Sequence, residues 1–333
     1  MKIKKWQLIK WREKTEVADL TQADFLSVGK HAFRRHRRLE EAYLPSSCST
    51  VKTEAFQGCR RLRRVVLSDQ TASGIAGGAF ENCTRLREMD GFEMISSIGA
   101  RSFAECRMLQ NAAFGRDLRR IGDEAFRGCT SLTEVSLPAS LRTIGRAAFA
   151  DCTELAHVTL QSGITALSPA LFRGCISLTE IEFADTLREI PKHAFRDCSA
   201  LTELALPGTL TRISAHAFDG CTRLERLSLQ NGTQSIGAGA FSNTPRLRAV
   251  EIPHSLKRLG FGAFGLGTRP EAEKTVFLVD NEYMRRRMKQ QLFLCGSSGC
   301  VRIELVGKSI EERRRERHRK DLEQKPTHLF DEE

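Results

Sequence analysis

Tryptophan, tyrosine and long apolar runs are scarce in this chain. Its 333 residues include only two Trp and two Tyr. Nowhere do about 18 apolar residues follow one another, so we expect no transmembrane helix. Charged residues such as Lys10 and Arg12 interrupt the segment that would have to be apolar in a signal peptide. We therefore expect a cytoplasmic protein whose thiols stay reduced.

The motifs of the common catalytic sites are also missing from the sequence. It contains no HExxH zinc motif, no Walker-type phosphate loop and no GxSxG nucleophile motif. We therefore expect no enzymatic activity, no cofactor and no metal site in this protein.

Phenylalanine and cysteine, in contrast, are abundant, with 19 and 11 residues. One Phe recurs every 23 residues, except for an interval of 24 between Phe56 and Phe80, where we place the extra residue in a loop at 68–74. Eight repeats have Cys three positions after this Phe, and ten have Leu six positions after it. The Phe markers are Phe33, Phe56, Phe80, Phe103, Phe126, Phe149, Phe172, Phe195, Phe218, Phe241 and Phe264. The Cys column is Cys59, Cys83, Cys106, Cys129, Cys152, Cys175, Cys198 and Cys221.

Each repeat contains the pattern of one short strand. At 135–137 two apolar residues flank Ser136, and Pro138 ends the strand because it lacks an amide hydrogen. A unit of 23 residues cannot bury its own apolar side. We therefore expect successive units to stack with their strands in parallel, forming an array about 50 Å long.

A family resemblance rests on one well-formed repeat. Residues 125–138, with the sequence AFRGCTSLTEVSLP, and the following Leu141 and Ile144 resemble the BspA-like leucine-rich repeat family over roughly 25–264. The resemblance implies a leucine-rich-repeat solenoid: a curved parallel β-sheet, about 23 residues per repeat, and mostly loop or short helix on the other side. Members of that family are similar to surface adhesins and protein-binding modules. The resemblance therefore implies a non-enzymatic protein–protein interaction module.

We expect caps at both ends of the array, because an open solenoid end would expose its core. Within the C-terminal cap we expect strands at 275–279 and 301–306 and a helix at 282–292. The expected boundaries are 1–24 for the N-terminal cap, 25–264 for the repeat array, 265–307 for the β-α-β cap and 308–333 for a charged tail.

Side chains eight and ten residues after the marker Phe are expected to point outward from the strands, and many are acidic. Like charges on adjacent strands repel, so we interpret this acidic stripe as a binding surface for a basic segment of a partner protein. A solvated face without function is the alternative. The candidate residues are Glu134, His157, Glu180, Glu182, Glu203 and Glu251. A basic edge is expected at Arg119, Arg120, Arg142, Arg188, Arg212, Lys257 and Arg258.

Two further hypotheses about function stay open. One is an adhesin-like surface protein exported without a recognisable signal. The other is a binder of nucleic acid or anionic membrane, since the formal net charge is +11 and the termini are basic. The residues behind the second hypothesis are Lys2, Lys4, Lys5, Lys10, Lys14, Arg34, Arg35, Arg37, Arg38 and Arg285–Arg287. In each case we expect a monomer.

Disulfides and metal sites are alternatives for the cysteines. The eight column cysteines occur one per repeat, without the CxxC spacing of metal sites, so we expect buried thiols. Cys295 and Cys300 lie outside the register. We expect a glycine-rich turn there, with half a metal site or a redox pair as alternatives. His193 and His216 share a repeat position, and we interpret them as structural surface residues.

Overall fold

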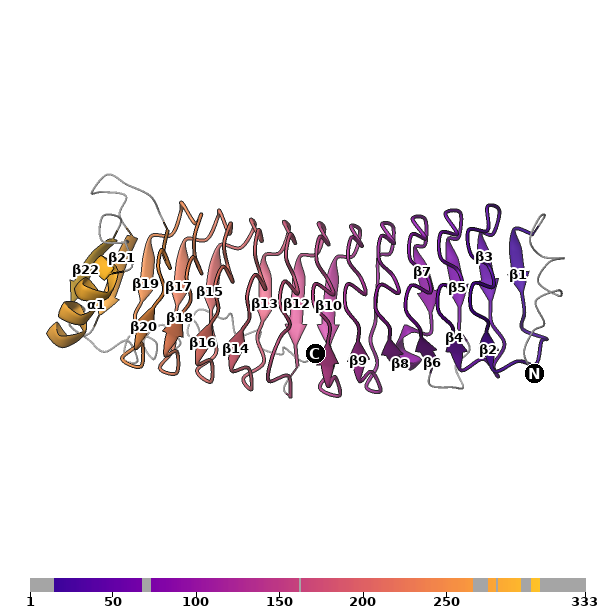
Figure 1. The fold of residues 1–333 in the computed structure, drawn as a ribbon, viewed down its shortest axis with the longest axis horizontal. Helices are drawn as coiled ribbons and strands as arrows, with labels where there is room; N and C mark the ends of the chain where they lie inside the picture. The colour runs from indigo at the N-terminus through magenta and orange to yellow at the C-terminus, as the bar shows by residue number, and fades with distance from the viewer. Residues whose placement is uncertain are drawn as a thin grey trace, which may run out of the picture.

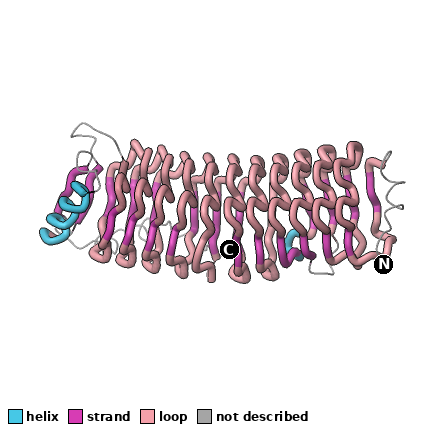
Figure 2. The backbone as a smooth tube through the Cα atoms, in the orientation of Figure 1, coloured by secondary structure: helices cyan, strands magenta, loops and turns pink. Residues whose placement is uncertain are grey.

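The computed structural model of the protein describes residues 15–67, 73–161, 163–265, 275–279, 281–294 and 301–305. Its turns stack along one long axis, with β1 (Val17–Asp19) at one end and α1 (Glu282–Leu294) at the other (Figure 1). Most of each turn is loop, with short strands along the stack (Figure 2). The predicted solenoid of parallel strands is confirmed.

The first strand of each repeat belongs to what we call the front ladder. Its strands pair in parallel and in register, so that Val135 lies beside Val158 of the next repeat. Within the described residues this ladder forms sheets of four, three and five strands. Its strands are β1, β3 (Glu41–Tyr43), β5 (Arg64–Val66), β7 (Glu88–Asp90), β10 (Glu134–Leu137), β12 (His157–Leu160), β13 (Glu180–Glu182), β15 (Glu203–Ala205), β17 (Arg226–Ser228), β19 (Ala249–Glu251), β21 (Thr275–Val279) and β22 (Val301–Leu305).

A second ladder of parallel strands, which the sequence did not predict, follows the closing part of each repeat. Several of its short strands bury one apolar side chain, such as Ile121 or Ile213, and leave Arg120 and Arg212 of the predicted basic edge exposed. The strands are β2 (Ser27–Val28), β4 (Thr50–Val51), β6 (Ser73–Ile75), β8 (Ile95–Ile98), β9 (Arg120–Ile121), β11 (Thr143–Ile144), β14 (Glu189–Ile190), β16 (Arg212–Ile213), β18 (Ser235–Ile236) and β20 (Arg258–Leu259). The interior therefore lies between two ladders and a row of turns.

The marker Phe side chains form a continuous stack through the core. From Phe33 to Phe264, consecutive rings lie 4.9–5.6 Å apart between centroids and are tilted by 3–16°. Their spacing follows the separation of neighbouring strands, because each repeat contributes one ring. Phe277 of β21 ends the stack edge-on, 4.8 Å from Phe264.

The cysteine column is a row of buried free thiols, as the sequence predicted. Each Sγ donates to the carbonyl oxygen of the marker Phe of the preceding repeat, for example Cys59 to Phe33 at 2.9 Å and Cys221 to Phe195 at 3.4 Å. Burial raises the pKa of Cys152 to about 12. The column therefore links successive turns, and the same Phe carbonyls also accept a backbone N–H within their own repeat, as from Cys59 to Phe56.

The turn after each marker Phe uses a left-handed residue. In each described case the residue two positions after Phe has a positive φ, a conformation that glycine and asparagine tolerate best. The residues are Arg35, Gly58, Asn82, Glu105, Gly128, Asp151, Gly174, Asp197, Gly220 and Asn243. The first repeat is the one that places an arginine there.

The C-terminal strands and helix form as predicted. Strand β21 pairs in parallel with β19, and β22 pairs in parallel with β21, so the front ladder continues beyond the repeats. Helix α1 connects these two strands and buries Met284, Met288 and Leu292. The side chains of α1 therefore cover one end of the core.

Several features discussed above lie outside the described residues. They are the two tryptophans, Trp6 and Trp11, the five lysines Lys2, Lys4, Lys5, Lys10 and Lys14, the segment 68–72 of the expected loop, Cys295 and Cys300, and the expected tail at 308–333. The boundaries 1–24, 25–264 and 265–307 stay predictions.

Candidate functional site

The outward side chains of the front ladder stand in two columns. In the first column Glu134, His157 and Glu180 lie opposite one another on β10, β12 and β13. In the second column Ser136, Thr159 and Glu182 do the same. Strand pairing thus brings four of the six predicted site residues onto one three-stranded sheet.

The other two predicted residues lie on the neighbouring sheet. Glu203 on β15 and Glu251 on β19 belong to the five-stranded sheet that begins after β13. No pairing between β13 and β15 is found in the described chain. The acidic stripe therefore runs over two sheets of the same ladder.

His157, Glu180, Glu182 and Glu251 each contact a side chain on a neighbouring strand. Nδ1 of His157 lies 3.0 Å from Oε2 of Glu180, and the hydroxyl of Thr159 donates to Glu182 at 3.4 Å. The hydroxyl of Ser228 donates to Glu251 at 3.0 Å. The side chain of Glu180 is 74% exposed, so its carboxylate stays available to a cation from solution.

Two arginines that we had not included also lie on this face. Arg226 occupies the same column as Glu203 and binds it, with 3.1 Å between Nη1 and Oε1. Arg64 on β5 binds Asp90 of β7 at 2.5 Å, and this hydrogen bond raises the pKa of Arg64 above its ordinary value. Both arginines stand eight residues after a marker Phe, so the repeat register could have revealed them. The stripe is consequently acidic between β10 and β15 and mixed on either side.

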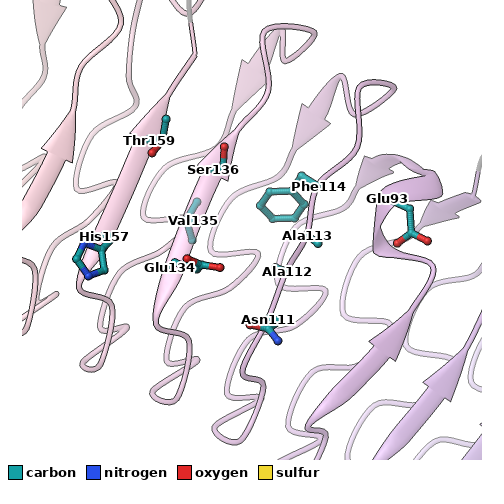
Figure 3. A pocket seen from close by; sticks show the side chains of 10 residues that line it. All are labelled: Glu93, Asn111, Ala112, Ala113, Phe114, Glu134, Val135, Ser136, His157 and Thr159. Atoms are coloured by element: carbon teal, nitrogen blue, oxygen red, sulfur yellow. The ribbon is translucent and has the colours of Figure 1, made fainter. Parts of the chain in front are cut away.

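A hollow of about 580 Å³ interrupts the face beside the predicted residues (Figure 3). Its lining includes Glu93 on one side, Phe114 in the middle, and Glu134 and His157 on the other side. No strand is assigned at 111–113 in this described segment, and the front ladder resumes only at β10. The hollow therefore lies where the repeat that begins at Phe103 contributes no strand to the front ladder.

The cause of the interruption is an irregular repeat. After β7 the chain continues through Gly91 into η2 (Phe92–Met94), a 3-10 helix. Phe92 is buried, and its ring lies 5.2 Å from that of Phe103 and 6.1 Å from that of Phe114. The backbone carbonyl oxygen of Glu93 lies very close to Gly115 in the following repeat. A Cβ atom on Gly115 would be 1.9 Å from that oxygen. The sequence signal was Gly91 at a position where most other repeats have an apolar residue.

A second hollow, also of about 580 Å³, lies toward the C-terminal end of the front ladder. Glu203, Arg226, Ser228 and Glu251 line it. Predicted site residues therefore border both hollows, and Glu180 and Glu182 lie on the strand between them.

The described residues contain no group of three or more His, Cys, Asp or Glu side chains placed to hold a metal ion. Likewise, no described helix has the length and apolar character that crossing a membrane requires. The exposed carboxylates of the stripe can form ion pairs and hydrogen bonds with cationic groups.

Repeats of about 23 residues, an in-register parallel front ladder and a buried leucine column define the class: this is a leucine-rich-repeat solenoid. A family model described as "BspA type Leucine rich repeat region" matches residues 26–156 and 143–267, with six copies. The chain belongs to the BspA type leucine-rich repeat family, as its residues had suggested.

Solved structures with a similar fold come from several bacteria. A leucine-rich repeat protein of Treponema pallidum ("T. pallidum Leucine Rich Repeat protein") is 30% identical, and the match covers 56% of this chain and 80% of that one, with a TM-score of 0.43. One from Bacteroides ovatus is 20% identical over 85% and 88% of the two chains, with a TM-score of 0.42. A leucine-rich cell surface protein from Faecalibacterium prausnitzii is 21% identical over 70% and 86%, with a TM-score of 0.33. No curated protein matches the chain.

Proposed function

We propose that this protein is a non-enzymatic binding module that holds a basic segment of a partner protein against its front ladder. The contacts would come from Glu134, His157, Glu180, Glu182, Glu203 and Glu251. The observation that carries this proposal is the exposed run of acidic side chains on β13 and β15, whose backbone is held by the stacked core. A rigid surface loses little conformational entropy when a partner binds.

The charges of this surface favour a basic partner. Glu180, Glu182 and Glu203 are exposed, and in the described chain the arginine or lysine that pairs with any of them is Arg226, while His157 lies against Glu180. A lysine- or arginine-rich segment lying across the strands would place positive charge against all three carboxylates. Such exposed pairs accelerate association and give specificity, and each adds modest affinity.

Charge reversal tests the proposal. The triple variant Glu180→Lys, Glu182→Lys, Glu203→Lys should bind a fluorescent octalysine peptide at least about tenfold more weakly at low salt. The control carries the same change of charge at Asp117, Glu154 and Glu225, which are exposed and lie outside the two outward columns. The control should bind nearly as the parent does. Equal loss in both variants, or no loss in the first, would contradict the proposal.

The native partner can then be sought with the same variants. Parent, triple variant and control are used as bait, and the proteins captured are compared by mass spectrometry. A basic protein captured by the parent and the control, and lost with the triple variant, is the expected result. A partner captured equally by all three would assign binding to another surface.

The cytoplasmic location is part of the proposal, and the row of reduced, buried thiols supports it. The alternative is an adhesin-like surface protein, and one structural neighbour is described as a cell surface protein. Fractionation of the native cells, with labelling of surface amines by a reagent that does not enter cells, separates the two. Labelled protein in the envelope fraction would favour the adhesin.

Binding of nucleic acid or anionic membrane through the basic termini is the remaining alternative. Among its residues, Arg34–Arg38 and Arg285–Arg287 belong to the described chain. Binding to DNA or anionic vesicles that falls steeply as salt is raised would support it. No binding at low salt would exclude it.

A further inference from the structure

A basic hollow of about 620 Å³ lies on the turn side of the first repeats, away from the front ladder. Four arginines line it, three from the turn after Phe33 and one from the turn after Phe56. The full lining is Arg34, Arg35, His36, Arg37, Gln57, Gly58, Arg60 and Asn82, and it contains no carboxylate. Positive charge is therefore concentrated in a concave site without a counter-charge among the residues that form it.

Within the described chain, one of these four arginines forms an ion pair. Arg34 reaches Glu54 at 3.4 Å, and the same carboxylate oxygen also binds His31 at 3.0 Å. No ion pair is found for Arg35, Arg37 or Arg60 in the described part of the chain. These three side chains are exposed and keep their donors available to a ligand.

Arginines on the later turns are arranged differently. Five of them lie 3.6 Å or less from a carboxylate, as in Arg101 with Glu81 at 2.5 Å or Arg107 with Glu105 at 3.1 Å. The others of this group are Arg127, Arg173 and Arg196. Arginines without an ion pair in the described chain, such as Arg223 and Arg246, thus occur on later turns too, but Arg35, Arg37 and Arg60 line one hollow together.

The first turn also holds its arginines in defined positions. Arg35 occupies the left-handed position with φ of 56°, and a Cβ on Gly58 would be 3.2 Å from its Cγ. The stem of Arg35 therefore lies across the next turn where that turn has no side chain. His36 replaces the column cysteine, is buried, and accepts the backbone N–H of Leu39 at 3.0 Å through Nδ1. These contacts fix the turn, which presents Arg35 and Arg37 on either side of the buried His36.

We propose that this hollow binds a short acidic peptide segment of a partner protein, through Arg35, Arg37 and Arg60. Guanidinium groups form paired, charge-assisted hydrogen bonds with carboxylates, which suits consecutive Asp or Glu residues. The inference concerns a second surface and does not depend on the proposed role of the front ladder. The protein would then contact acidic and basic segments at separate places.

The extent of the hollow favours a peptide over a nucleic acid. Its arginines come from two neighbouring turns, which span only about 5–10 Å along the array. The third turn contributes Asn82, and the neighbouring Glu81 is bound by Arg101 and Gln57. No Phe, Tyr or Trp lines the hollow, and the imidazole of His36 is buried in the turn, so the lining offers no exposed ring on which a base could stack. A nucleic acid needs a longer basic track, since its affinity grows with the number of phosphates contacted.

Peptide binding tests this inference. A fluorescent octaglutamate peptide is titrated with the full chain by anisotropy at low salt. The variant Arg37→Glu, Arg60→Glu should weaken binding by about tenfold or more, and Arg37→Gln, Arg60→Gln by a smaller factor. The control is Arg223→Glu, Arg246→Glu, which makes the same change of charge at exposed arginines on distant turns. Thermal unfolding of each variant checks that it folds.

The outcomes are distinct. Loss of binding in the Arg37/Arg60 variants with retention in the control supports the inference. Equal loss in the control, or unchanged binding in the Arg37/Arg60 variants, overturns it. Tighter binding of an oligothymidine of equal charge would assign the hollow to nucleic acid. The Glu180/Glu182/Glu203 triple variant should keep its affinity for octaglutamate, so failure of the front-ladder proposal leaves this test unaffected.

Discussion

Nη1 of Arg226 lies 3.1 Å from Oε1 of Glu203 on the neighbouring strand of the front ladder. The pair stands where the acidic stripe reaches the second hollow. Both side chains are more than 60% exposed, so the pair contributes little to stability. Its main effect is on the surface potential, because Arg226 neutralises one of the carboxylates that a basic partner would use.

Removing that arginine should strengthen binding of a basic ligand. Arg226→Ser is expected to increase the affinity for octalysine about two- to fivefold at low salt, since Glu203 is released. Arg223→Ser removes the same charge outside the outward columns and should change the affinity less. Anisotropy titration measures both. Weaker binding by Arg226→Ser would show that the front ladder does not attract cations in this way.

The irregular repeat should be sensitive at Gly115. A methyl group there would lie 1.9 Å from the carbonyl oxygen of Glu93, so Gly115→Ala must displace either η2 or the backbone around residue 115. We expect a loss of about 1–3 kcal/mol in the free energy of unfolding, measured in urea. Gly29→Ala is the matched control, because nothing lies within 4 Å of its Cβ position. Equal stability of the two variants would contradict the close approach.

Truncation of the core columns should be costly. Leu132→Ala or Phe126→Ala removes a fully buried side chain and is expected to cost about 2–5 kcal/mol. Because each repeat contacts mainly its neighbours, the change can also uncouple the stack locally. Leu26→Ala, at a side chain that is 63% exposed, should cost less than about 0.5 kcal/mol. Urea denaturation followed by circular dichroism tests this difference.

The thiols of the column should be inert in the native protein. Burial raises the pKa of Cys152 to about 12 and that of Cys198 well above its ordinary value, so almost no thiolate is present near neutrality. A thiol reagent at about pH 8 should label no column cysteine quickly until denaturant is added. Labelling read out by mass spectrometry checks this. Rapid native labelling of most of the eight would show that the column is accessible.

The pair of histidines predicts a pH effect. The rings of His193 and His216 are stacked 5.4 Å apart. Burial, and then Lys192 and Arg196, lower the pKa of His193. Below its ordinary pKa the unfolded chain therefore binds a proton more readily than the folded chain, and stability falls as the pH drops through about 6.5.

The variant His193→Gln should reduce this loss. The effect is expected to stay below about 1 kcal/mol, because His193 is only partly buried. His254→Gln, at an exposed histidine, is the control. Thermal unfolding at about pH 7 and about pH 5 gives the comparison. A larger loss of stability in His193→Gln than in the parent would contradict the sign of the effect.

Much of the fold could be predicted from particular residues. The recurrence of Phe and Cys indicated stacked units, and Val135 with Leu137 indicated an inward-facing strand. The second ladder was missed because two-residue strands such as Arg120–Ile121 leave no alternating pattern. Arg226 was missed on the candidate face although its repeat position was known. Its ion pair with Glu203 depends on the side-chain conformations of two neighbouring strands, which the sequence does not specify.

The amino-acid sequence by itself determined the repeat, the buried columns and the repeat positions that face outward on the front ladder. In a solenoid each unit contacts mainly its neighbours, so sequence period translates directly into spatial stacking. Only the tertiary structure decided where the stack departs from that period. The hollow beside Phe114 depends on how η2 packs against Gly115. The basic hollow depends on which arginines find a carboxylate on the next turn and which do not.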